Sequence, residues 1–325
     1  MSKNLGKEQD VVSHTDAILV AGGSGFVGRH LVKELSQKGE TVVSMYRNRL
    51  PDPMANVYPV CSDLSSTELL AAPLRGVDTV VYLAWKGSFI TSPEIPQGMD
   101  DGEINSPNID LLQHLIEAME KADTRRIIFL SAIGSHRRSK TPFLREKYSA
   151  EKLVLNSQIK EKIIVRTSIL CGNINGSDRF LNSIIGIMRY PGFYPAPFRG
   201  KRSSPLYVED LSKLISALTS VSISEPALII EMTGKENFKS EDLFKIIADR
   251  FTKGAKIQLK GKLGSALLPV FEKRTKENPT GPLLKDFIDV GSEARDSIKL
   301  NNPLYQEIPS DIKNFRDVLE SVDTA

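Results

Sequence analysis

The sequence is short of cysteine and histidine and has little excess of either charge. Its 325 residues include two cysteines, four histidines, 43 Lys plus Arg and 40 Asp plus Glu, a net charge of +3. Two cysteines are too few for a disulfide scaffold, and the histidines show no metal-ligand spacing, so we predict no metal site. Balanced charge argues against nucleic acid or an anionic membrane as a partner. Cys61 and Cys171 each end an apolar, strand-like run, and we expect both to be buried as small core hydrophobes.

Long apolar segments are also missing. No stretch approaches the roughly 20 apolar residues that a membrane-spanning helix needs, and the polar N-terminus lacks the apolar core of a signal peptide. We therefore expect a cytoplasmic protein in which residues 1–15 form a flexible tail. The composition, 40% hydrophobic and 26% charged, is typical of a globular chain with a sizeable core.

What the sequence does contain is a regular alternation of short apolar runs and amphipathic stretches from residue 17 onward. The run AILVAGG is followed by a helical pattern, FVGRHLVKELSQKG, and then by another apolar run, TVVSMYR. This order predicts an α/β fold with a doubly wound parallel sheet covered by helices on both faces. We expect the sheet domain to span residues 16–172, with 204–233 returning to it, and the rest of 173–325 to form a smaller C-terminal α/β lobe.

A glycine-rich turn between the first run and the first helix carries the strongest functional signal. Its glycines satisfy both the G-x-G-x-x-G and the G-x-x-G-x-x-G spacing. In such a turn, backbone N–H groups and the positive end of a helix converge where a pyrophosphate binds. The pattern predicts a Rossmann-like dinucleotide site formed by Gly22, Gly23, Ser24, Gly25, Phe26, Val27 and Gly28.

The turn resembles that of extended and atypical short-chain dehydrogenase/reductases, a family that includes NAD-dependent epimerases and dehydratases. Its members typically read TGGxGFxG, where this chain has Ala21 in place of threonine. CSDL resembles the family's third-strand motif, which implies that Asp63 and Leu64 meet the adenine. VDTVVYLAW resembles the fourth strand, which implies three further cofactor contacts: Leu83, Ala84 and Trp85.

The end of the second apolar run predicts which dinucleotide binds. NAD enzymes place Asp or Glu there, about 20 residues after the glycines, whereas NADP enzymes place an arginine nearby. This run ends in SMYRNR, with Tyr46 at the position of the acid and Arg47 and Arg49 after it. We expect NADP(H) rather than NAD(H), with Arg47 at the ribose phosphate. The alternative is that both arginines are solvated loop charges.

A second motif, FLREKYSAEK, contains two overlapping candidate pairs. Tyr148 and Lys152 have the Tyr-x-x-x-Lys spacing of a proton relay, and Phe143 and Lys147 repeat the spacing without the hydroxyl. On a helix, a shift of five residues rotates the pair by roughly 140°. Projection places Lys147 in an apolar arc with Phe143, where a lysine needs a partner, and this favours Lys147 as the residue that faces the cofactor. The polar side of the projection holds Arg145, Ser149, Lys152 and Asn156.

The family resemblance favours the same register. The segment SAIGSHRRSKTPFLREKYSAE resembles the corresponding sequence motif of a subgroup that includes the NADPH-binding accessory subunit of respiratory complex I and its bacterial relatives. In this register Lys147 occupies the position of the family's lysine and Glu151 that of its downstream glutamate, while Phe143 occupies the position of the tyrosine. The usual proton donor is therefore missing. Ser131 and Asn108 resemble the family's remaining polar catalytic positions.

The sequence is compatible with three functions. The first, slightly favoured because most chains with this fold are enzymes, is an NADP(H)-dependent oxidoreductase or epimerase/dehydratase acting on an unknown small molecule, with Arg202 meeting a substrate phosphate. The second is a cofactor-binding protein with little or no turnover, which serves structure, assembly or redox sensing. The third, an interaction module without cofactor, is disfavoured by the intact glycine turn. Oligomeric state is open, although helices near 108–121 and 142–157 form a homodimer interface in many relatives.

Overall fold

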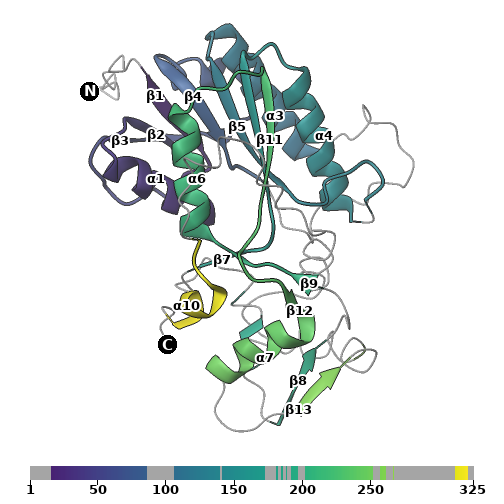
Figure 1. The fold of residues 1–325 in the computed structure, drawn as a ribbon. Coiled ribbons are helices and arrows are strands. Elements are labelled where there is room, and N and C mark those ends of the chain that lie inside the picture. The colour runs from purple at the N-terminus through teal and green to yellow at the C-terminus, as the bar shows by residue number, and fades with distance from the viewer. Residues whose placement is uncertain are drawn as a thin grey trace, which may run out of the picture.

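The computed structural model describes residues 16–85, 106–139, 141–172, 181, 184–185, 188, 192–196, 202–251, 257–260, 266 and 312–320. A large sheet is covered by helices on both faces, and a smaller group of short strands and helices lies beyond one end of its strands (Figure 1). The predicted flexible tail, residues 1–15, lies outside the described residues.

The large sheet has seven parallel strands in the order β11-β6-β5-β4-β1-β2-β3. Their bounds are β1 Ala17–Ala21, β2 Val42–Tyr46, β3 Val57–Cys61, β4 Val77–Tyr82, β5 Arg126–Ala132, β6 Glu161–Thr167 and β11 Ala227–Met232. The chain winds outward from β1 in one direction and from β4 in the other. The crevice between these two strands is the switch point at which such folds bind ligands. The predicted doubly wound α/β fold is confirmed.

Five of the described helices pack on the sheet: α1 Phe26–Gln37, α2 Thr67–Leu70, α3 Pro107–Lys121, α4 Pro142–Asn156 and α6 Val208–Ser220. α1 and α6 pack together on one face, and α2, α3 and α4 lie on the other (Figure 1). Leu19 and Ala21 accordingly face one hydrophobic core, whereas Ile18 and Val20 face the other. Because both faces of β1 are buried, its sequence is a continuous apolar run.

Local sequence explains where the helices begin and end. α3 begins at Pro107, directly after Ser106, whose hydroxyl accepts a hydrogen bond from the backbone N–H of Ile109 at 3.3 Å. α4 begins at Pro142, a residue well suited to the first turn of a helix. α1 ends shortly before Gly39, whose φ of +82° is a left-handed conformation that glycine adopts readily.

The smaller group of elements lies beyond the carboxyl ends of the sheet strands (Figure 1). It contains the strand pairs β7 Leu170–Cys171 with β10 Leu206–Tyr207, β8 Phe193–Ala196 with β13 Ile257–Lys260, and β9 Arg202–Ser203 with β12 Phe238–Lys239, and the helices α7 Ser240–Phe251 and α10 Phe315–Glu320. Its core includes Leu243, Phe244 and Phe315. Asp210 of α6 accepts a hydrogen bond from the backbone N–H of Lys313 at 3.0 Å, which ties the last described segment to α6.

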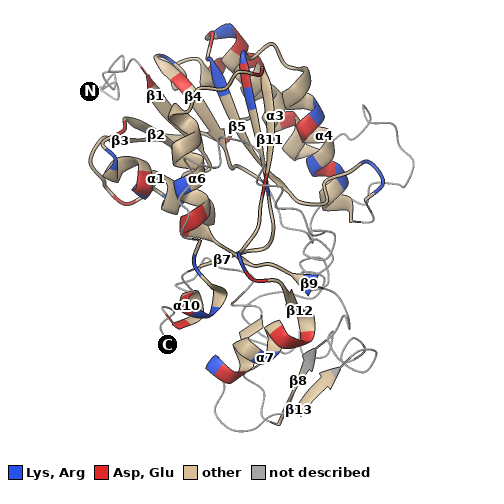
Figure 2. Cartoon of the chain, in the orientation of Figure 1, with Lys and Arg blue, Asp and Glu red and all other residues tan. Residues whose placement is uncertain are grey.

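Charged residues of both signs are interspersed along the described elements (Figure 2). One partly buried group joins the N-terminal ends of β4, β5 and β6, where Arg125 donates to Asp78 at 2.8 Å and Arg126 donates to Glu161 at 2.7 Å. Arg126 is 1% exposed and also donates to backbone carbonyls at the end of α6. This ion-pair group fixes α6 at the sheet edge opposite the glycine turn. None of the described helices has the length and apolar character needed to cross a bilayer.

The two cysteines differ in burial. Cys171 is buried, as expected, but Cys61 is exposed. Cys61 ends β3, which is the outermost strand on its side of the sheet and so is not covered by a further strand. The prediction that both thiols lie in the core is therefore wrong for Cys61, because an apolar run does not distinguish an edge strand from a central one.

Candidate functional site

The glycine-rich turn lies between β1 and α1, at the carboxyl edge of the sheet. Gly22 has a φ of +91°, and a Cβ atom there would lie 2.9 Å from the backbone nitrogen of Ala84. A Cβ atom at Gly28 would lie 2.1 Å from the carbonyl oxygen of Gly22. The backbone of the turn thus approaches both α1 and the loop after β4 more closely than a side chain permits. This approach aims the first N–H groups of α1 at the space beside the turn.

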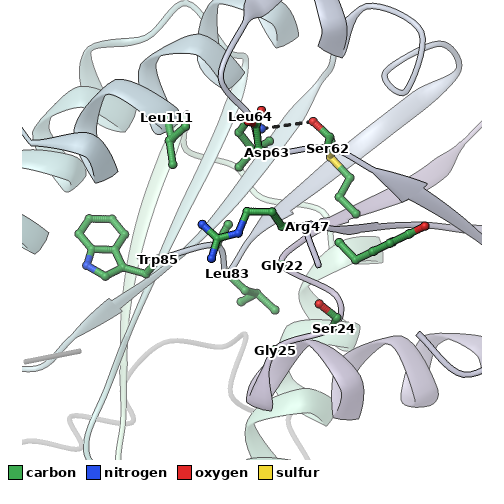
Figure 3. Close-up of a pocket in the computed structure, with 13 residues that line it drawn as sticks. Gly22, Ser24, Gly25, Arg47, Ser62, Asp63, Leu64, Leu83, Trp85 and Leu111 are labelled. Atoms are coloured by element: carbon green, nitrogen blue, oxygen red, sulfur yellow. Dashed lines mark hydrogen bonds between the residues drawn. The ribbon is translucent and has the colours of Figure 1, made fainter. Parts of the chain in front are cut away.

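A pocket of about 480 Å³ opens beside the turn (Figure 3). Its lining consists of Gly22, Ser24, Gly25, Met45, Tyr46, Arg47, Ser62, Asp63, Leu64, Leu83, Ala84, Trp85 and Leu111. Most of these residues are predicted cofactor contacts. The other members of the predicted turn do not line the pocket: Gly23, Phe26, Val27 and Gly28. Gly28 and Gly23 instead allow α1 to pack tightly against the strands, since added Cβ atoms would meet Gly22 and Ser44.

Four lining residues were not predicted as contacts. Met45 and Tyr46 end β2, and Ser62 follows β3, so a rule that strand ends at the switch point line the crevice would have found them. The Ser62 hydroxyl accepts a hydrogen bond from the backbone N–H of Leu64 at 3.2 Å, shown dashed in Figure 3. Leu111 comes from α3 and has no local signal in the sequence.

Arg47 places a cation in the pocket. Its side chain extends from the end of β2 across the pocket toward Trp85 (Figure 3). Asp63 is the acidic residue of the lining, and its carboxylate accepts a hydrogen bond from the backbone N–H of Ser65 at 3.0 Å. Tyr46 occupies the end of β2, where an NAD-type carboxylate would stand. The pocket therefore combines a guanidinium and a positive helix end with a single carboxylate, which suits an anionic ligand.

Lys147 lies behind Trp85, outside the lining of the pocket. Its ammonium group lies 3.6 Å from the centroid of the Trp85 ring and donates a hydrogen bond to the carbonyl oxygen of Leu130 at 2.8 Å. The rings of Phe129 and Phe143 lie 4.9 and 5.9 Å from the same nitrogen. The lysine that the sequence places at the cofactor is thus next to the pocket, with an indole ring as its nearest aromatic neighbour.

The charge of Lys147 reflects a balance between burial and neighbouring carboxylates. The side chain is 7% exposed, and this burial lowers its pKa to about 7. Glu146 and Glu151 act in the opposite direction, because each carboxylate stabilises the ammonium form. Near neutral pH the side chain therefore exists in both protonation states.

Ser131 and Asn108 each contact a buried glutamate of α4. The Ser131 hydroxyl donates to Oε1 of Glu151 at 2.5 Å, and Nδ2 of Asn108 donates to Oε1 of Glu146 at 3.1 Å. Glu151 also forms an ion pair with Arg166 of β6 at 2.7 Å. Both glutamates are almost fully buried, so these contacts compensate for the loss of water. The polar groups that the family resemblance assigns to catalysis are therefore engaged within the protein.

The alternative register lies on another side of α4. The ring of Tyr148 lies 6.0 Å from the ring of His136, and neither Tyr148 nor Lys152 lines the pocket. The helical projection is wrong for Arg145 and Ser149, which were placed on the polar side but are buried. Arg145 donates a hydrogen bond to a backbone carbonyl of the preceding loop at 2.7 Å. Side-chain type alone does not reveal this contact.

The predicted substrate residue Arg202 lies in β9, in the smaller group of elements. It is exposed, and its guanidinium donates to the side-chain and backbone oxygens of Asn237 at 2.5 and 2.8 Å. Arg202 does not line the pocket. Within the ranges that the structure describes, no three His, Cys, Asp or Glu side chains come together as a metal site requires.

Known proteins resemble this chain in sequence and in fold. Residues 22–176 match a protein-family model described as NAD(P)H-binding. NADH dehydrogenase (ubiquinone) 1 alpha subcomplex subunit 9, mitochondrial, from Arabidopsis thaliana is 26% identical over 244 residues, which are 71% of this chain and 56% of that subunit. Photosystem II assembly factor Ycf39 from Synechocystis sp. is 25% identical over 160 residues, 48% of this chain and 46% of that protein. The chain therefore contains an NAD(P)H-binding domain and is homologous to these two proteins.

The residues that match the NAD(P)H-binding model include the glycine turn and the whole lining of the pocket. The chain spans about half the length of these curated relatives. Among solved structures, a nucleoside-diphosphate-sugar epimerase from Staphylococcus aureus has a TM-score of 0.68 at 16% identity, covering 94% of this chain and 99% of that one. MoeE5 in complex with UDP-glucuronic acid and NAD has a TM-score of 0.60 at 20% identity, covering 76% and 87%. At these identities the likeness is one of fold.

Proposed function

We propose that this short-chain dehydrogenase/reductase-like protein binds NADP(H) in the pocket and catalyses little or no reaction with it. The proposal rests on one observation: the candidate catalytic side chains already contact other groups of the protein. Lys147 contacts an indole ring and a backbone carbonyl, while Ser131 and Asn108 donate to buried carboxylates. Phe143, at the position of the family's tyrosine, has no proton to transfer.

Three parts of the pocket suit different parts of the dinucleotide. The N–H groups of the turn, residues 22–28, would hold the pyrophosphate. The turn can take this close-packed shape because its glycines have no side chains. Asp63 and Leu64 would meet the adenosine, and Arg47 its additional phosphate. Trp85 lines the remaining end of the pocket. When bound, the dinucleotide supplies a nicotinamide that carries a hydride.

A reductase is the second candidate. The observation that favours it is the pKa of about 7 at Lys147, because an ammonium of that acidity suits proton transfer near neutrality. One curated relative, 27% identical over 118 residues, is a 3-beta-hydroxysteroid dehydrogenase from Mycolicibacterium neoaurum. The sequence alone leans slightly to such an enzyme. The internal contacts of Ser131 and Asn108 favour a structural, assembly or redox-sensing protein instead, roles in keeping with the names of the complex I and photosystem II relatives.

We expect bound NADPH to persist when quinones, ketones or nucleotide sugars are added, with no oxidation above the rate in buffer. Loss of NADPH absorbance measures the reaction. Phe143→Tyr restores a phenol whose ring would lie near Lys147, and it too is expected to be inactive because Ser131 and Asn108 remain engaged. Turnover by the wild-type protein would favour the reductase.

Arg47→Ala is expected to weaken NADPH binding by about 10- to 100-fold, since hydrogen bonds to a charged group contribute about 1.5–3 kcal/mol. NADH lacks the additional phosphate, so its affinity should stay within about twofold of wild type. Isothermal titration calorimetry measures both. Arg49→Ala is the matched control, because Arg49 is a neighbouring exposed arginine outside the pocket lining. Equal affinities of the wild-type protein for NADPH and NADH would refute the preference for NADP(H).

The organisation beyond the pocket is also part of the proposal. We assign residues 16–172 and 204–233 to the dinucleotide-binding domain, because β11 joins the large sheet beside β6. The rest of 173–325 is assigned to the smaller lobe. A homodimer through α3 and α4 and a cytoplasmic location stay predictions from the sequence.

A further inference from the structure

Trp85 contacts both the pocket and a buried ammonium. The indole lines the pocket, whereas Lys147 does not, and the lysine nitrogen lies 3.6 Å from the ring centroid. The carbonyl oxygen of Leu130 holds the same nitrogen at 2.8 Å. Trp85 stands on the opposite side of the pocket from Ser62 and Ser24 (Figure 3). A positive charge is therefore held just behind one end of the pocket.

That end is the one left for the nicotinamide if the proposed function is right. The N–H groups of the turn suit the pyrophosphate, and Arg47, Ser62 and Asp63 come from the ends of β2 and β3, where the adenosine half binds in this fold. A dinucleotide extends in two directions from its pyrophosphate. Its nicotinamide half then lies toward Trp85, with Lys147 behind the indole.

The two redox forms of the nicotinamide differ by one charge. The oxidised ring is a cation and the reduced ring is neutral, so an ammonium nearby repels only the oxidised form. Such repulsion is strong where water is excluded, and Lys147 is buried. An indole face attracts cations, but the Trp85 ring already carries the ammonium of Lys147.

We propose that Lys147 and Trp85 make the pocket selective for the reduced dinucleotide: Trp85 contacts the nicotinamide half, and Lys147 disfavours its oxidised, cationic form. Lys147 is then a specificity-determining residue rather than a proton donor. The contact of Trp85 with the nicotinamide half is made by its ring, because the indole Nε1 is buried. A protein with this preference responds to the reduction state of the dinucleotide.

The charges around Lys147 set the pH range of the effect. Glu146 and Glu151 on α4 favour the ammonium, and Arg166 of β6 is paired with Glu151. From β4, Tyr82 contributes a phenol that stays neutral, because burial raises its pKa. Since the pKa of Lys147 is about 7, the ammonium is present below that pH and is lost as the pH rises through it. Selectivity for the reduced form should therefore be strongest in mild acid.

The test compares NADPH, NADP⁺ and 2′-phospho-ADP-ribose, which lacks nicotinamide, by calorimetric titration of the whole chain. At about pH 6 we expect NADPH to bind about tenfold more tightly than NADP⁺, with the ratio falling to about two near pH 8.5. Lys147→Met should give a ratio near one at both pH values, while 2′-phospho-ADP-ribose binds within about twofold of wild type. Lys152→Met, which alters a half-exposed lysine of the same helix, is the matched control and should behave as wild type.

Trp85 is the single tryptophan of the sequence, so its fluorescence reports on the contact. NADP⁺ at saturating concentration should quench this emission and 2′-phospho-ADP-ribose should not; NADP⁺ is used because the dihydronicotinamide of NADPH absorbs in the emission range and quenches by energy transfer without contact. Equal quenching by both would overturn the role of Trp85.

The wild-type pH series requires no variant, so the proposal stays testable if Lys147→Met does not fold. An NADPH to NADP⁺ affinity ratio that changes neither with pH nor in Lys147→Met would overturn the selectivity, while binding of 2′-phospho-ADP-ribose would leave the proposed function standing. If the wild-type protein binds none of the three ligands, the proposed function itself fails.

Discussion

Gly28→Ala is expected to abolish NADPH binding and to destabilise the fold. The added methyl group would lie 2.1 Å from the carbonyl oxygen of Gly22 and 2.7 Å from the Cα atom of Gly23. Both atoms belong to the backbone, so relief requires the turn to move away from α1. We expect the free energy of unfolding to fall by about 1–3 kcal/mol, the usual cost of overpacking.

The loss of affinity should be larger than the loss of stability. Moving the turn misaligns the N–H groups that would hold the pyrophosphate, and several weakened hydrogen bonds to a charged group reduce affinity by at least about 100-fold. Gly39→Ala is the matched control: Gly39 lies at the other end of α1, and nothing lies within 4 Å of the added Cβ atom. Its positive φ makes the substitution cost about 1 kcal/mol without changing affinity.

Urea unfolding and calorimetric titration separate the two effects. A Gly28→Ala protein that folds and binds NADPH within about threefold of wild type would place the dinucleotide elsewhere in the molecule.

The turn and the sheet were predictable from the sequence because their determinants are local. Strand β1 is apolar on both faces, and the glycines follow it directly, so strand, turn and helix lie within one short segment. The ends of neighbouring parallel strands then meet at one edge. This is why Asp63 and Leu83, far apart in the sequence, line the same pocket beside the turn.

The interior of the helix pair α3 and α4 was not predictable in the same way. Projection assigned Arg145 and Ser149 to a polar face, because a helical wheel records side-chain type and not what covers it. Glu146 is fully buried, and hydrogen bonds of 2.5 and 3.1 Å from Ser106, just before α3, and from Asn108 of α3 compensate for its loss of water. Such pairing depends on how two helices pack, and no periodicity in either helix reveals it.

Glu151→Gln should destabilise the protein by about 2–4 kcal/mol, because breaking this buried ion pair leaves Arg166 with only its weaker, more exposed partner Glu231. Glu151 is 2% exposed, and its two carboxylate oxygens accept hydrogen bonds from Arg166 at 2.9 and 2.7 Å. One of those oxygens also accepts the hydroxyl of Ser131. The neutral amide keeps the shape of the side chain and removes the charge that holds Arg166 between α4 and β6. The decrease should appear as a lower urea midpoint of unfolding.

Glu231→Gln is the matched control, because Glu231 is the other acidic partner of Arg166. It lies 3.3 Å from the guanidinium and is 32% exposed, so its loss should cost less than about 1 kcal/mol. If Ser131 serves mainly to bind the side chain at position 151, the amide oxygen in Glu151→Gln can still accept its hydroxyl, and NADPH affinity should stay within about twofold of wild type. Equal destabilisation by the two substitutions would contradict a structural role for the buried carboxylate. A large loss of NADPH affinity in Glu151→Gln alone would instead return Ser131 and Glu151 to the functional site.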